Sequence, residues 1–124
     1  MAALTADRKS CQYVGSEIAL TAAEDIYAGA MVQINSEGKV ANATAAGGKV
    51  IGVAAHGVKA GEAIRVVRAG VFGFVNDSGD GVIAATEIGE TCYAADNQTV
   101  TKTAGNAKVG EIFGFDGDVV LVKI

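Results

Sequence analysis

The sequence predicts a small all-β protein, rich in Gly and Val, that folds as a β-sandwich or barrel with two related halves and an extended N-terminal arm. Three observations support this fold class. Short apolar runs alternate with Gly-rich turns, no stretch keeps a helical period, and one sequence pattern occurs twice. Many short strands at regular spacing are typical of sandwiches and barrels.

The repeated pattern begins at Gly29 and again at Gly89. Each copy has a glycine, a short apolar run, a polar turn, an isolated valine and then a valine-rich strand that contains glycine. The copies span residues 29–68 and 89–124 and are offset by about sixty residues. We therefore expect one β domain over residues 17–124, built from two similar meanders.

In the first half, alternation or apolar runs between turn residues predict strands at 17–20, 30–34, 39–42, 49–55 and 62–68. Residues 21–25 fit either one helical turn capped by Thr21 or a loop. Polar and Gly-rich segments between the strands supply the turns.

In the second half, strands are expected at 71–75, 91–95, 99–103, 109–115 and 118–124. Residues 86–90 fit a turn or a single helical turn. Phe72 and Phe74 share one face of their strand, because side chains two residues apart point the same way. They either pack in the core or form an exposed aromatic face for a subunit contact.

The composition fits one small domain that associates with other protein chains. The chain has 124 residues, of which 50% are hydrophobic, so its interior is small for its apolar content. We expect some apolar surface to be buried against another chain. The net charge is −4 and the basic residues are scattered, which argues against nucleic-acid binding.

The first sixteen residues have no period and are expected to form an arm, either a disordered tail or a segment that orders on a partner. The candidate contacts in this arm are apolar anchors and a basic pair: Leu4, Tyr13, Val14, Arg8 and Lys9. No secretory leader opens the chain and no apolar run is long enough to span a bilayer, so we expect no membrane association.

Cys11 and Cys92 are too few for a disulfide framework, and we expect both thiols to be free in a reducing cytosol. A single bridge between them stays open as an alternative. His56, the one histidine, has no metal-ligand neighbours at useful spacing and no evident cysteine partner. We therefore expect no catalytic residue, no cofactor and no metal.

One segment resembles a calcium-binding loop. Its ligand positions would be Asn76, Ser78, Asp80, Gly81 and Glu87. No helix is expected before it, because residues 71–75 are predicted to be a strand, and the same composition is ordinary for a turn. Whether this loop binds calcium is left open by the sequence.

The stretch from Ala28 to Val75 resembles small decoration, or capsid cement, proteins of tailed-bacteriophage heads. The matching residues are Val32, Gly38, Val40, Val50-Ile51-Gly52-Val53-Ala54, Gly61-Glu62, Ile64, Val66 and Gly70-Val71. A second, looser block starts at Gly89 and includes Tyr93, Val109-Gly110 and the Val-rich last strand. The resemblance covers roughly residues 15–124 and depends on Gly and Val positions.

This resemblance implies a virion structural protein, made in the bacterial host cytoplasm, that binds the outside of the capsid shell and stabilises it. It also implies two partners, the major capsid protein and further copies of the chain in a homotrimer, with the N-terminal arm lying along the shell. Such an arm would bind by strand pairing, strengthened by many copies on one shell. The alternative is a small accessory or carbohydrate-binding β-barrel domain associated with an enzyme.

Overall fold

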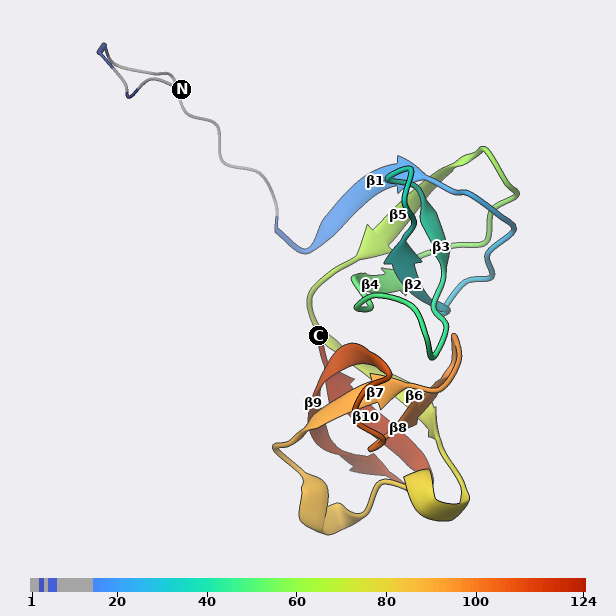
Figure 1. Cartoon of the computed structure of the whole chain (residues 1–124), viewed down its shortest axis with the longest axis vertical. Helices are drawn as coiled ribbons and strands as arrows, with labels where there is room; N and C mark the ends of the chain where they lie inside the picture. The colour runs from blue at the N-terminus through green and yellow to red at the C-terminus, as the bar shows by residue number, and fades with distance from the viewer. Residues whose placement is uncertain (1–2, 4, 7–14) are drawn as a thin grey trace.

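The computed structural model describes residues 3, 5–6 and 15–124 of the chain. Two β-sheets of five strands each lie within residues 17–123 (Figure 1). The first sheet contains β1 (Glu17–Thr21), β2 (Met31–Ile34), β3 (Val40–Asn42), β4 (Gly52–Ala54) and β5 (Ala63–Val67). The second contains β6 (Val71–Asn76), β7 (Thr91–Ala94), β8 (Thr99–Thr101), β9 (Ala107–Asp116) and β10 (Val119–Lys123). Two short 3-10 turns, η1 (Gly79–Gly81) and η2 (Ala85–Glu87), lie between β6 and β7.

The two halves have the same topology. The first sheet has the order β1-β5-β4-β2-β3, and adding five to each number gives the order of the second, β6-β10-β9-β7-β8. The second sheet closes into a barrel because β6 also pairs in parallel with β8. In the first sheet, the equivalent contact is a single parallel bridge between Ala22, which directly follows β1, and Val40 of β3. The prediction of an all-β fold with two related halves is confirmed.

Two glycines at equivalent positions allow the closest backbone approach in each half. Val32 is opposite Gly52 in the β2–β4 pair, and Cys92 is opposite Gly110 in the β7–β9 pair. A Cβ atom on Gly52 would overlap the carbonyl oxygen of Val67, and one on Gly110 would overlap the carbonyl oxygen of Lys123. Only glycine fits where backbones approach so closely.

The halves also share an apolar core. Met31, Ala43, Val50 and Val53 of the first half belong to the same buried cluster as Phe74, Val120 and other barrel residues. Backbone hydrogen bonds cross the boundary, including Met31 N to Asn97 O (2.8 Å) and Val50 N to Lys108 O (2.8 Å). Ile124, which follows β10, lies at this boundary (Figure 1), where its amide donates to Gly70 O at 2.9 Å.

The observed strands follow the predicted ones, with differences at their limits that are largest in β4 and β9. Residues 49–51 are not strand, because the Val50 amide bonds to the other half instead of continuing β4. Of the two alternatives for residues 21–25, the loop is the one observed: Thr21 ends β1, and Ala22 makes the bridge to Val40. β9 is longer than expected and contains a bulge opposite Leu121 and Val122.

The aromatic pair of β6 belongs to the core. Phe74 is buried and Phe72 packs against the same cluster, so the exposed aromatic face that we considered for them is wrong. Within the described ranges no helix has the length and apolar character that crossing a membrane would require.

Candidate functional site

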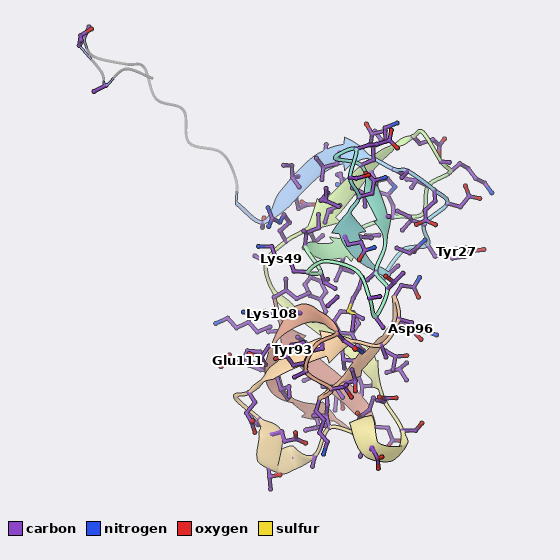
Figure 2. All side chains as sticks on the ribbon, in the orientation of Figure 1. Tyr27, Lys49, Tyr93, Asp96, Lys108 and Glu111 are labelled. Atoms are coloured by element: carbon purple, nitrogen blue, oxygen red, sulfur yellow. The ribbon has the colours of Figure 1, made fainter. Side chains whose placement is uncertain are left out.

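A groove of about 550 Å³ opens where the two halves meet. Its lining comes from the loop before β2, from β6 and β10, and from the turn after β7: Tyr27, Gly29, Gly73, Val75, Asn97 and Val119. Tyr27 stands at its rim with 83% of its surface exposed, and Figure 2 shows it projecting away from the body. Val75 and Val119 leave 51% and 41% of their surfaces exposed. The groove is therefore largely apolar and open.

The backbone that carries Tyr27 is held firmly on both sides. Ile26, which is buried, exchanges two hydrogen bonds with Val58, at 3.0 and 2.9 Å. The Ala30 amide donates to Tyr27 O at 3.2 Å, and Gly29 takes a left-handed φ of 87° within that turn. Gly29 N then donates to Ala54 O at 2.9 Å. The exposed tyrosine thus sits on an ordered turn, and little backbone entropy would be lost on binding.

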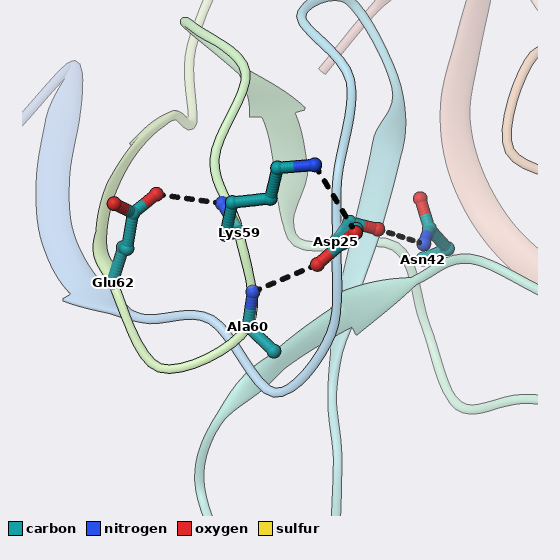
Figure 3. Close-up of polar contacts among 5 residues, drawn as sticks. All are labelled: Asp25, Asn42, Lys59, Ala60 and Glu62. Carbon is teal, nitrogen blue, oxygen red and sulfur yellow. Dashed lines mark hydrogen bonds and ion pairs between the residues drawn. The ribbon is translucent and has the colours of Figure 1, made fainter.

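A polar network braces the same loop from the other side (Figure 3). Asp25 accepts a hydrogen bond from the Ala60 amide at 2.9 Å, and its backbone oxygen accepts one from Asn42 Nδ2 at 3.1 Å. Lys59 Nζ lies 3.7 Å from Asp25, and Glu62 accepts from the Lys59 amide at 2.7 Å. These groups are exposed and bond mainly to backbone atoms, so the cluster anchors two loops to each other.

The loop that resembles a calcium site uses its key side chains for other contacts. Asn76 accepts from Ile83 N and donates to Ile83 O, both at 2.9 Å. Glu87 accepts from Ala84 N at 2.8 Å. In the described part of the chain, no three His, Cys, Asp or Glu side chains gather as metal ligands would. The loop geometry is that of a self-bonded turn.

His56 and Cys92 occupy unrelated structural positions. His56 Nε2 accepts a hydrogen bond from the Arg65 amide at 3.2 Å, and Nδ1 lies 3.3 Å from Gly57 O, so the ring bonds to β5 just beyond the end of β4. Cys92 is fully buried in the barrel, and burial raises the pKa of its thiol to about 11. A thiol of this kind is a weak nucleophile at neutral pH.

The candidate arm residues, Leu4, Arg8, Lys9, Tyr13 and Val14, lie outside the described residues, as does Cys11. No family model matches the chain, and no curated protein or solved structure matches it either.

Sequence patterns did not predict that Tyr27, Val75 and Val119 lie on the surface. One signal was present: residues 71–75 contain no polar side chain on either face of the strand, although a solvent-covered barrel should alternate. Tyr27 carried a weaker signal, as an aromatic residue inside a loop segment.

Proposed function

We propose that this protein is a decoration protein of a tailed-bacteriophage head, which binds the outside of the capsid shell and stabilises it without catalysing a reaction. The observation that carries the proposal is the combination of an ordered all-β body with an exposed apolar groove and rim tyrosine. The polar clusters of the described residues bond to nearby backbone groups instead of converging on a reactive centre. Such a molecule is suited to binding other proteins.

The resemblance described from the sequence supports the same proposal. Its apolar positions Val32, Val40 and Val66 are fully buried, and its Gly52 is one of the two glycines that permit close strand packing. In this proposal the partners are the major capsid protein and other copies of the chain in a homotrimer. The protein is made in the host cytoplasm and resides on the capsid surface.

Electron microscopy of shells assembled with and without the protein tests this function. We expect regular added density on the outside of the shell and greater resistance of decorated shells to heat. A variant lacking residues 1–14 should keep its circular dichroism spectrum and oligomer mass but leave shells bare, because the arm supplies the shell contact. Full decoration by the truncated protein would overturn the role of the arm, and bare shells with the intact protein would overturn the function.

A carbohydrate-binding domain is the second candidate, and the exposed Tyr27 beside a groove is the observation that favours it. Sugar-binding proteins commonly stack an aromatic ring on a sugar face. Isothermal titration calorimetry with a panel of oligosaccharides distinguishes the two. Saturable binding that disappears in Tyr27→Ser would favour this candidate over decoration.

A further inference from the structure

The strand β1 has an outer edge that its own sheet does not cover. It is the last strand of the first sheet in the order of pairing and lies at the limit of that sheet (Figure 1). Beyond it, the bridge of Ala22 with Val40 corresponds to the pairing of Asn76 with Val100 in the barrel. By this correspondence, the outward residues of the two first strands are equivalent in the order Glu17, Ala19 and Thr21 to Val71, Gly73 and Val75.

The backbone groups along this edge are unused. Arg68 N donates to Ser16 O at 2.7 Å, so Ser16 faces β5. Successive residues of a strand point alternately to its two edges, and the amides and carbonyls of Glu17 and Ala19 therefore point away from β5. Within the ranges that the structure describes, these four groups have no hydrogen-bond partner.

Ile18 shows that the edge is also open on its apolar side. It is opposite Val66, which is fully buried, yet 43% of its own surface is exposed. The equivalent Phe72 of the barrel packs against the core cluster. A further strand beside β1 would cover Ile18 and bond to the four free backbone groups at the same time.

β1 also lacks the features that usually prevent pairing at an edge. Natural edge strands carry a lysine, a proline or a bulge, which blocks the approach of another strand. β1 has the sequence EIALT and pairs with β5 in an unbroken register. Its one charge, on Glu17, lies 3.8 Å from Arg65 of β5.

We propose that the outer edge of β1 binds an extended segment of the shell protein, which pairs with Glu17–Thr21 as an additional strand. A row of amides and carbonyls at two-residue spacing is complementary to the backbone of another strand, so the partner segment is extended polypeptide. This proposal rests on the function proposed above: β1 directly follows the arm, and a shell contact made by the arm places this edge beside the shell.

Hydrogen exchange of the full chain, free and bound to shells, detects the pairing directly. In the free chain the amides of Glu17 and Ala19 should exchange rapidly, because they have no acceptor among the described residues. On decorated shells we expect both to exchange at least about tenfold more slowly. The amides of Val71 and Gly73, at the equivalent edge of β6, are the internal control and should exchange equally fast in both states.

A matched pair of variants tests whether the free amide contributes to binding. Ala19→Pro removes this amide without breaking a hydrogen bond of the described residues, and proline is tolerated where an edge strand faces solvent. Ala19→Ser keeps the amide. In cosedimentation with shells, Ala19→Pro should bind at least about tenfold more weakly than the wild type, and Ala19→Ser should bind as the wild type does.

Ile18→Lys decides the matter if Ala19→Pro loses its circular dichroism spectrum, because it places a charge on the same edge and should weaken binding equally. Shells decorated by the wild type without protection of the Glu17 and Ala19 amides would overturn this proposal alone. Full decoration by both Ala19→Pro and Ile18→Lys would do the same. Slow exchange of the two amides in the free chain would show that another segment already covers the edge, and would also overturn it. Bare shells with the wild type would overturn the proposed function, and this proposal with it.

Discussion

The two halves of the molecule share their backbone requirements and differ in their surfaces. Both have the same strand order, a left-handed glycine before the second strand (Gly29 and Gly89), and a glycine beneath a facing carbonyl (Gly52 and Gly110). They differ in closure and in outer polarity: the first has a single bridge and a charged face, and the second a closed barrel and an apolar face. The two halves thus share the glycines that the backbone geometry requires, whereas their exposed side chains differ in polarity.

The largest effects are expected at Gly52 and Gly110, where the two halves have the same close backbone contact. Each substitution to alanine places a Cβ against a backbone carbonyl, which cannot move aside as a flexible side chain can. We expect each to lower the free energy of unfolding by about 3 kcal/mol or more, measured by urea denaturation. Similar losses in the two variants would show that both halves depend on the same contact.

Gly114→Ala is the matched control for these variants, because it lies in the same strand as Gly110 and a Cβ there meets nothing within 4 Å. It should be neutral or slightly stabilising. A harmless Gly52→Ala beside a costly Gly110→Ala would show that the two halves have different backbone constraints despite their common strand order.

The fold was largely predictable because backbone constraints, such as turns that need glycine, produce patterns in the local sequence. The copies starting at Gly29 and Gly89 predicted a shared meander, and the structure confirms it. The limits of β4 were not predictable, since Val50 and Ile51 are as apolar as strand residues but Val50 bonds to the other half. Whether residues 49–51 extend β4 is decided by a tertiary contact, which produces no pattern in the local sequence.

The candidate surface was less predictable than the fold. Burial of alternate residues predicts which side of a strand faces inward, but not what the outward side meets. The sequence does not distinguish Val75 from any other strand valine. Its register opposite Val119, and its position equivalent to Thr21 of the first half, become known only from the structure. The groove also needs residues 27–30 beside β6, a contact between segments far apart in the chain.

The second prediction concerns the buried pair Val32 and Cys92, which are equivalent in the two halves, each opposite one of the close-packed glycines. Burial raises the pKa of Cys92 from its ordinary value of 9.0 to about 11. Between these values the unfolded chain loses the thiol proton first, so stability that is present below about pH 9 is lost as the pH rises towards about 11. The loss approaches roughly 3 kcal/mol.

Cys92→Val removes this titration and copies the residue of the first half. We expect the difference in unfolding free energy between wild type and variant to be constant from neutral pH to about pH 9 and then to move in favour of the variant. Urea denaturation at several pH values measures it. Parallel curves through about pH 11 would show that the thiol ionises as readily in the folded chain as in the unfolded one.

The smallest expected effects concern the loops that follow β1 and β6, which the halves fix by different chemistry. In the second half the half-buried Asn76 satisfies both backbone groups of Ile83. Asn76→Ala should cost about 2 kcal/mol, because partly buried polar groups lose their partner. In the first half Asp25 accepts the Ala60 amide at an exposed position, and Asp25→Ala should cost about 1 kcal/mol.

Lys59→Met separates the hydrogen bond of Asp25 from its ion pair. The side chains of Lys59 and Asp25 are 80% and 63% exposed, so water and salt screen their attraction. We expect Lys59→Met to change the free energy of unfolding by less than about 0.5 kcal/mol, and Asp25→Asn, which keeps an acceptor for Ala60, to cost less than Asp25→Ala. If Lys59→Met were as costly as Asp25→Ala, and if salt removed the difference from wild type, the ion pair would be the anchor. The loop carrying Tyr27 would then be held in place mainly by the attraction between Lys59 and Asp25.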